Sequence, residues 1–428
     1  MVDVVENIHL SDRKTSLSFS AQLLPKLIYV GDVPVEASYH GSALLHRLLE
    51  KYAAARLTIV ETGSESLPAR RLQDAKYFWQ PIASRRWMNT RFHPYVVGFY
   101  SAATNRSARK ILSCVADIEF DSVLTVAHGF GWLAAAALAE SRKVPLNLIV
   151  HDDWPRVAQV PGALRGWLDE RFGEVYRQSH SRLCVSPAMR DTYKRNYGET
   201  GQVLYPVRDQ RCSEFSAPPL RLSSNDHQFT VAFAGTINTA GYVEALKHLS
   251  EALRSVDGRV LLFGPLSQSE AQAVGLNLPN VVLRGLLDSA DLIATLRDEA
   301  DVLFAPMSYA KEDRLNMEMA FPSKLADYTA VGLPLLVYGP QYSSVVRWAT
   351  DNPGVAEVIT NEGGDHLSDA VSRLRSAPGH RVALGTRALE VGRQYFSYDV
   401  IQGVFDRALV PTVVQTQMTS VAASCSPG

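Results

Sequence analysis

Short apolar runs recur along most of the chain. Each run is rich in Val, Ile and Leu and is apolar at almost every position rather than at every second one. Runs apolar throughout indicate strands buried on both faces, and therefore parallel sheets covered by helices. In the first half of the chain they lie at 26–32, 56–62, 122–129, 146–152, 181–186 and 202–207. In the second half they lie at 229–235, 259–264, 280–285, 300–306, 334–339 and 356–360.

Segments with helical periodicity separate many of these runs. They lie at 42–55, 132–141, 243–256, 290–299, 324–331 and 343–352. Strands that alternate with helices are typical of a doubly wound α/β sheet. About twelve strands exceed the number that a single open, twisted sheet usually contains. The pattern therefore predicts two Rossmann-like domains with parallel sheets that face each other across a cleft.

The best break between the two halves is the polar, aperiodic segment at 208–228, which contains two consecutive prolines. The predicted domains are accordingly 1–207 and 229–395. A last helix is predicted at 396–410, and the tail at 411–428 has too little apolar periodicity to pack. Ligands of open α/β sheets bind beyond the carboxyl ends of the strands, so two facing rims favour a bipartite small-molecule site. The alternative is a second domain that only stabilises or oligomerises the first.

Composition narrows the class of protein. The 428 residues include 43 Lys and Arg against 44 Asp and Glu, and this balance argues against a whole-protein nucleic-acid binder. The four cysteines form no C-x-x-C pair, so neither a zinc site nor a disulfide framework is indicated. The first residues are polar and acidic, unlike a secretion signal, and no apolar run approaches the roughly 20 residues that span a bilayer. A cytoplasmic location is expected.

The segment at 320–340 carries the densest chemistry. Ser323 is a favoured N-cap for a helix that Gly332 ends in a left-handed conformation. The helix start and the charge of Lys324 would seat a phosphate. Asp327, one turn further on the same face, could accept the two hydroxyls of a ribose. Together these features predict a nucleoside diphosphate site, whereas the plain alternative is a capped helix with a local Lys–Asp ion pair.

The order P-S-K-L-x-D-Y-x-x-x-G-x-P in this segment resembles the donor-site segment of retaining GT-B glycosyltransferases of the glycogen-synthase-like superfamily (group 1 type). FAGTINTAGYVEAL resembles the first strand, glycine loop and helix of their donor domain, and YFSYDVIQGVFDRAL resembles their terminal crossover helix. The resemblance spans most of 25–408 and is weaker over 64–122. It implies a GT-B fold and a sugar transfer from a UDP- or GDP-sugar to a glycan or lipid-linked acceptor. It also implies retention of configuration, a role in polysaccharide or glycoconjugate synthesis, and no metal or other cofactor.

The resemblance also implies site residues. Those expected to bind the donor are Gly41, Gly235, Thr236, Gly264, Arg284, Gly285, Ser323, Lys324 and Asp327. Those expected to act in catalysis are His128, Lys324 and Glu318. Asp152 or Asp153, at another strand end, is expected to position the acceptor; adjacent carboxylates point in different directions, so no metal site is expected there.

Two departures from the family pattern bear on the diphosphate. The Arg and Lys that usually follow the first donor-domain strand are replaced by Thr236 and small or polar residues such as Asn238 and Ala240. The usual first glutamate falls on Met319, with Glu318 beside it. Stabilisation of the diphosphate is therefore expected from Lys324, the helix start, and Arg284 or Arg314.

Three alternatives remain open at this point. Gly129-x-Gly131-x-x-Ala134, with acids at the next strand end, resembles a dinucleotide fingerprint and would suit an NAD-dependent enzyme. It ranks lower because it follows a middle strand and because Trp132 would stand where pyrophosphate approaches. The other two alternatives are a nucleotide-sugar epimerase of the same fold and a nucleotide-sugar-binding subunit without catalysis.

The region 69–110 combines nine Lys and Arg with one acid and interleaved aromatic residues. Such surfaces suit anionic membranes, so a peripheral contact with the inner membrane face is expected here. The alternative is a first-domain insertion whose rings pack inward and whose arginines face water.

Overall fold

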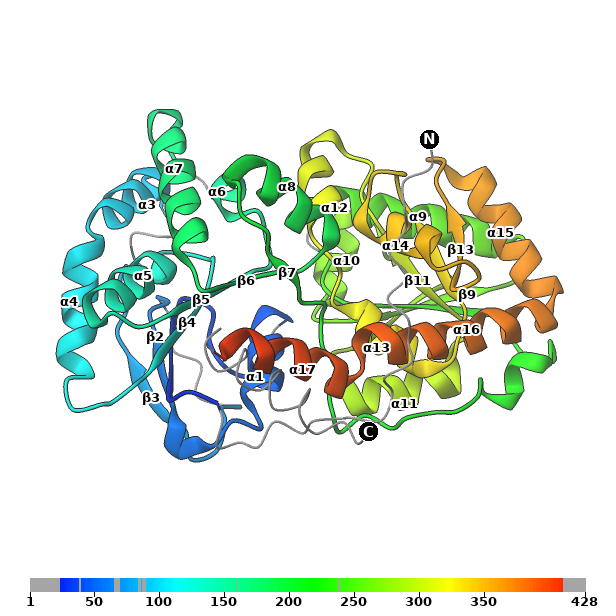
Figure 1. The fold of residues 1–428 in the computed structure, drawn as a ribbon. Coiled ribbons are helices and arrows are strands. Elements are labelled where there is room, and N and C mark those ends of the chain that lie inside the picture. The colour runs from blue at the N-terminus through cyan, green and yellow to red at the C-terminus, as the bar shows by residue number, and fades with distance from the viewer. Residues whose placement is uncertain are drawn as a thin grey trace, which may run out of the picture.

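The computed structural model describes residues 24–37, 40–64, 70–83, 86, 90–158, 160–237 and 239–410. The predicted tail at 411–428 and Asn238 therefore lie outside the described residues. Within the described chain, two parallel sheets stand side by side and helices cover both faces of each (Figure 1). This is the predicted pair of Rossmann-like domains, and the architecture is GT-B.

The first domain holds a seven-stranded sheet in the order β3-β2-β1-β4-β5-β6-β7. Its strands are β1 (Leu27–Gly31), β2 (Leu57–Glu61), β3 (Lys76–Trp79), β4 (Ser122–Val126), β5 (Leu146–Val150), β6 (Ser181–Cys184) and β7 (Gln202–Val203). Its helices are α1 (His40–Leu49), α3 (His93–Ala102), α4 (Thr104–Cys114), α5 (Gly131–Arg142), α6 (Trp154–Val157), α7 (Gly162–Gln178) and α8 (Pro187–Tyr197). The strand order reverses between β1 and β4, and their carboxyl ends mark the crevice where a ligand is expected.

The second domain holds a six-stranded sheet in the order β10-β9-β8-β11-β12-β13. Its strands are β8 (Thr230–Ala234), β9 (Arg259–Phe263), β10 (Val281–Gly285), β11 (Val302–Pro306), β12 (Leu335–Tyr338) and β13 (Ala356–Ile359). Its helices are α9 (Ala240–Arg254), α10 (Gln268–Val274), α11 (Ser289–Glu299), α12 (Arg314–Met319), α13 (Lys324–Val331), α14 (Ser344–Asp351), α15 (Gly364–Ser376) and α16 (Pro378–Phe396). Here the order reverses between β8 and β11.

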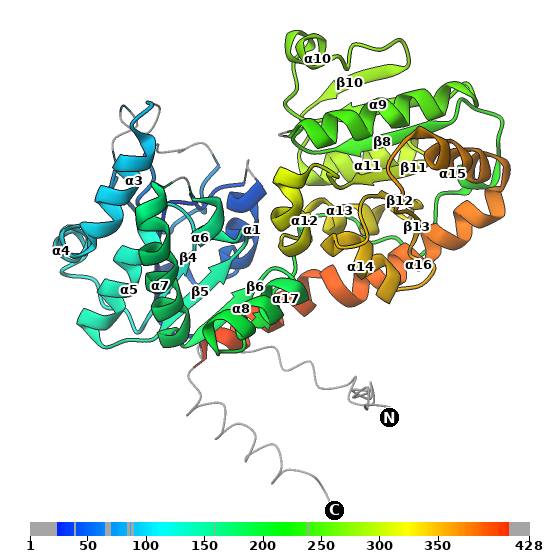
Figure 2. The ribbon, with the colours of Figure 1, turned by 90° about the horizontal axis from the view of Figure 1, so that it is seen from above.

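The C-terminal helices return the chain to the first domain. α16 packs along the second domain, and α17 (Tyr398–Leu409) then runs under the first (Figure 2). Ile401 and Phe405 of α17 are buried in one apolar cluster with residues of β1 and α1. The last described helix therefore belongs, by its contacts, to the core of the first domain.

The twelve strands expected from the apolar runs are confirmed, and α13 has the predicted bounds. The strand β3 was missed, because its four residues are partly or fully exposed and its three aromatic residues differ from the Val, Ile and Leu runs that marked the other strands. The predicted side-chain cap of α13 is wrong. Ser323 already has helical backbone angles and its hydroxyl makes no capping bond, since the first turn closes by backbone bonds to Pro322 and Ser323 carbonyls.

Candidate active site

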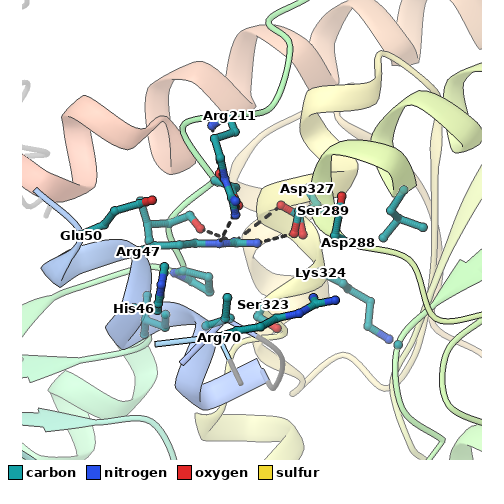
Figure 3. Close-up of a pocket in the computed structure, with 18 of the residues that line it drawn as sticks. His46, Arg47, Glu50, Arg70, Arg211, Asp288, Ser289, Ser323, Lys324 and Asp327 are labelled. Atoms are coloured by element: carbon teal, nitrogen blue, oxygen red, sulfur yellow. Dashed lines mark hydrogen bonds and ion pairs between the residues drawn. The ribbon is translucent and has the colours of Figure 1, made fainter. Parts of the chain in front are cut away.

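A cavity of about 980 Å³ lies between the facing rims of the two sheets. The first domain contributes α1 and the segment that leads from β2 to β3, and the second contributes the loops after β8 and β9 and the starts of α11 and α13. Figure 3 shows side chains from both sides pointing into this space. Among the residues predicted for the site, the lining includes Asp152, Gly235, Thr236, Gly264, Ser323, Lys324 and Asp327.

Two glycines shape the second-domain wall. Gly235, directly after β8, has φ +143° and donates its N–H to Phe263 O at 2.8 Å. A Cβ on Gly235 would lie 3.3 Å from the Nζ of Lys324, and a Cβ on Gly264 would lie 2.5 Å from the carbonyl oxygen of Gly235. Both φ angles favour glycine, and the missing side chains leave room for a ligand to approach the backbone beside the lysine.

Lys324 has an unusual environment. Its ammonium nitrogen lies 3.9 Å from the ring centroid of Phe233 and 5.4 Å from that of Tyr242. Among the described residues, no carboxylate lies within 4.0 Å of that nitrogen, so the local Lys–Asp ion pair of the plain alternative is absent there. Burial lowers the pKa of Lys324 to about 7. A half-buried lysine that faces a cavity without a counter-ion is suited to bind an anionic ligand.

Asp327 meets an arginine that the sequence analysis did not single out. Arg47 of α1 crosses the cleft, and its Nη1 lies 3.7 Å from Asp327 Oδ1. The same guanidinium donates to Ser289 Oγ at 2.5 Å and to Val207 O at 2.7 Å, and lies 4.0 Å from Asp209. Arg47 therefore joins the two domains at the carboxylate expected to bind the ribose. Its only sequence signal was a basic residue late in the helix that follows the first strand.

The first-domain rim brings together two histidines. His128 is exposed and stacks on Trp154 with ring centroids 4.7 Å apart, and it is not part of the cavity lining. His151 has a buried Nε2 without a hydrogen-bond partner in the described chain, and burial lowers the pKa of this imidazole to about 4. A Cβ on Gly41 would come within 4.0 Å of its Nδ1. His151 is thus a neutral side chain beside the first turn of α1. Gly41, expected in a loop at the donor phosphates, lies in that turn and is not part of the cavity lining.

The adjacent aspartates take opposite directions, as expected for neighbours. Asp152 lines the cavity. Asp153 is 2 % exposed; it accepts from Tyr193 Oη at 2.9 Å and pairs with Arg156 at 2.8 Å. Of the two, Asp152 is therefore the one that faces the cavity. In the part of the chain that the structure describes, no group of three or more His, Cys, Asp or Glu is arranged to hold a metal ion.

Solved structures share this architecture. HepE from Anabaena, in complex with UDP, superposes with a TM-score of 0.64 at 13% identity, over 90% of this chain and 99% of that one. Sucrose-phosphate synthase from Thermosynechococcus elongatus gives 0.61 at 14% identity, over 94% and 100%. The α,α-trehalose 6-phosphate synthase of Burkholderia multivorans gives 0.59 at 12% identity, over 94% and 99%. At these identities the likeness establishes the fold.

A family model adds sequence support within the first domain. Residues 45–207 match the model described as Glycosyltransferase Family 4. This chain is a GT-B glycosyltransferase. The chain matches none of the curated proteins with which it was compared.

Several residues expected at the glycosyltransferase site lie apart from the cavity lining. The guanidinium of Arg284 holds both carboxylate oxygens of Glu299, so a contact with a diphosphate would require it to leave that partner. Gly285 is exposed at the end of β10. Arg347 donates to the backbone carbonyl of Glu318 at 2.6 Å, and Met319 is 1% exposed, its carbonyl accepting from Ser186 Oγ at 2.5 Å.

The dinucleotide-like glycines of this glycosyltransferase serve another purpose. Asp32, after β1, accepts from the N–H groups of Phe130 and Gly131 at 2.8 and 2.9 Å and from the hydroxyl of Thr62. The anion at the start of α5 is therefore the protein's own carboxylate, and a Cβ on Gly129 would collide with it. Trp132 is fully buried, so its indole does not stand where a pyrophosphate would approach, and that reason for ranking the NAD alternative lower is wrong.

Proposed function

We propose that this glycosyltransferase uses a nucleoside-diphosphate sugar, with a UDP-sugar favoured over a GDP-sugar, and transfers the sugar with retention. The observation that carries the proposal is the ammonium of the half-buried Lys324 against Gly235, without a carboxylate partner among the described residues and with Asp327 one helical turn away in the same cavity. HepE was solved with UDP and with UDP-glucose, which supports uridine. A trehalose-6-phosphate synthase of the same architecture, studied with bisubstrate glycomimetics, transfers its glycosyl group with retention.

In this proposal the second domain holds the donor. Lys324 and the first turn of α13 bind the diphosphate, and Asp327 accepts hydrogen bonds from the ribose hydroxyls. Leu286 and Leu287, which line the cavity beyond β10, contact the base. Departure of the diphosphate develops negative charge beside Lys324, so the lysine stabilises the transition state more than the ground state.

The proposed acceptor is a lipid-linked glycan at the cytoplasmic membrane face, in polysaccharide or glycoconjugate synthesis. Large aromatic side chains are exposed in one stretch of the first domain, and they are Trp79, Phe92, Tyr95 and Phe99. Arg106, Arg109 and Lys110 of α4 add positive charge nearby, which suits an anionic surface. Other rings of the region, such as Tyr77 and Phe78, pack against the core. Within the described residues, no helix is long and apolar enough to cross a bilayer.

Thermal shift measurements with UDP, GDP and NAD test the donor class, because a bound ligand raises the melting temperature by mass action. We expect UDP to raise it and NAD to leave it unchanged, since Asp32 already occupies the start of α5. Lys324→Ala should abolish the UDP shift. Lys247→Ala, which removes a half-exposed lysine of α9 paired with Glu244, is the matched control and should keep the UDP shift. A UDP shift that survives in Lys324→Ala contradicts the proposed site.

Turnover assays distinguish the transferase from the two remaining alternatives, a nucleotide-sugar epimerase and a subunit that binds nucleotide sugar without catalysis. Incubation with donor alone, followed by NMR, detects the epimer that a nucleotide-sugar epimerase would form. Release of UDP that depends on added acceptor supports the transferase. Binding of UDP without turnover on any acceptor pool would favour a non-catalytic subunit.

A further inference from the structure

The second-domain wall of the cavity is poor in positive charge for a site that would hold a diphosphate. Its charged lining residues are Lys324, Asp288 and Asp327. Lys324 has a pKa of about 7, so near neutral pH it carries only part of a charge before a ligand arrives. The loop after β8, where Thr236 lines the cavity, supplies no cation among its described residues. Further positive charge must come from across the cleft.

The first-domain side presents several arginines, and most are already engaged. Arg47 lies between Asp209 and Asp327, Arg71 is paired with the buried Glu61, and Arg211 holds Asp209 at 2.7 Å. Arg70 differs. It lines the cavity and is exposed, and among the described residues no carboxylate lies within 4.0 Å of its guanidinium.

The backbone around Arg70 fixes the direction of its side chain. Arg71 forms an antiparallel bridge with Glu36, and Ala37 donates its N–H to the carbonyl of Arg70 at 3.1 Å. The guanidinium of Arg71 turns inward, to Glu61 and over the ring of Tyr77 at 4.5 Å. The exposed side chain of Arg70, by contrast, lines the cavity, so it points into the cleft. Figure 3 shows it extending toward the wall that carries Ser323 and Lys324.

We propose that Arg70 of the first domain binds the diphosphate of the donor and supplies the positive charge that the loop after β8 lacks. The inference rests on the proposed function and deepens it: the diphosphate is held from both domains, by Lys324 on one side and Arg70 on the other. Arginine suits this role because it is always charged and its planar fork matches phosphate oxygens. A diphosphate bound by residues of both domains also requires the two walls of the cleft to lie close together.

The test compares Arg70→Ala and Arg70→Lys with the wild-type chain, by calorimetry with UDP and with uridine and by steady-state transfer. Loss of a charge-assisted contact should weaken UDP binding about tenfold or more and leave uridine binding unchanged. The rate of transfer should fall by about a hundredfold, since the contact strengthens as the diphosphate departs. Arg70→Lys should recover part of both. Arg254→Ala, which removes an exposed arginine of α9 outside the cavity, should match wild type.

Three results would overturn the inference. The first is unchanged UDP affinity in Arg70→Ala, and the second is an equal loss of affinity for UDP and uridine. The third is a change confined to a higher KM for the acceptor, which would assign Arg70 to an anionic acceptor instead. The proposed function fails separately, if the wild-type chain does not bind UDP or GDP in a Lys324-dependent way.

Discussion

Lys324 shows how one side chain can be tuned by what surrounds it. Phe233 and Tyr242 present ring faces to its ammonium, and burial alone lowers its pKa. A bound diphosphate would raise the pKa of Lys324, because a nearby anion favours the charged form of the amine. The lysine should therefore take up a proton when the ligand binds.

This yields a prediction about pH. At pH 8 the free amine is mostly neutral, because its pKa is about 7, and the complex should hold it charged. Binding of UDP should then take up about one proton, and UDP affinity should fall as pH rises above 7, by up to tenfold per unit. Calorimetry in two buffers of different ionisation enthalpy measures the uptake. Lys324→Arg, which stays charged, should show none, and the absence of uptake in the wild type would contradict the lowered pKa of this lysine.

At the scale of elements, the position of α13 depends on a helix far along the chain. Gly385 and Gly392 of α16 face the C-terminal part of α13: a Cβ at Gly392 would lie 2.5 Å from Thr329, and one at Gly385 would collide with the carbonyl of Gly332. The two helices therefore approach each other at glycines. Since α13 carries both Lys324 and Asp327, this packing positions the donor site.

We predict that Gly392→Ala shifts α13 and destabilises the protein by about 1–3 kcal/mol, because overpacking a close helix contact strains both helices. UDP affinity should fall as well, because the shift of α13 moves Lys324 and Asp327. Gly379→Ala is the control in the same helix: a Cβ there meets nothing within 4 Å, so the change should be neutral or stabilising by up to about 1 kcal/mol. Denaturant unfolding and calorimetry measure both effects. Equal behaviour of the two variants would show that the glycine contact does not place α13.

Individual helices and strands are the features that the sequence could predict. Continuous apolar runs located twelve strands, and the order of lysine, carboxylate and glycine located α13 and two residues that do line the cavity. Prediction failed where structure depends on distant partners. β3 is a short edge strand without the Val, Ile and Leu of the other runs. The glycines near 130 resembled a nucleotide loop because Asp32, which fills that loop, lies almost a hundred residues earlier. Spacing within an element is visible in a sequence, whereas contacts between elements are not.

At the scale of the whole molecule, the contacts that join the domains were also invisible in the sequence. Arg208 donates to the carbonyl of Ala326 at 3.2 Å, Ser186 donates to that of Met319 at 2.5 Å, and Tyr205 meets Phe321 with ring centroids 5.0 Å apart. These contacts surround the base of the cleft. Arg47 extends the series into the cavity itself, where a ligand would compete for its partner Asp327.

Removal of that arginine should therefore loosen the relation between the domains. Its guanidinium holds Val207, the last residue of the first domain, and Ser289 of the second domain at once, so Arg47→Ala loses both charge-assisted bonds and should destabilise the protein by about 2 kcal/mol. The radius of gyration of the ligand-free protein, measured by small-angle scattering, should increase. Arg47→Lys should restore little, because one ammonium cannot reach the partners of a planar fork.

Arg211→Ala is the matched control for this prediction. Arg211 also binds Asp209, but its side chain is 61% exposed and no hydrogen bond or ion pair joins it to the second domain among the described residues. Its removal should leave the scattering curve unchanged. If Arg47→Ala and Arg211→Ala scatter alike, the domains are held by the apolar contacts at the base of the cleft. If only Arg47→Ala has a larger radius of gyration, and UDP reduces it again, a donor bound by both domains can replace Arg47 as the link between them.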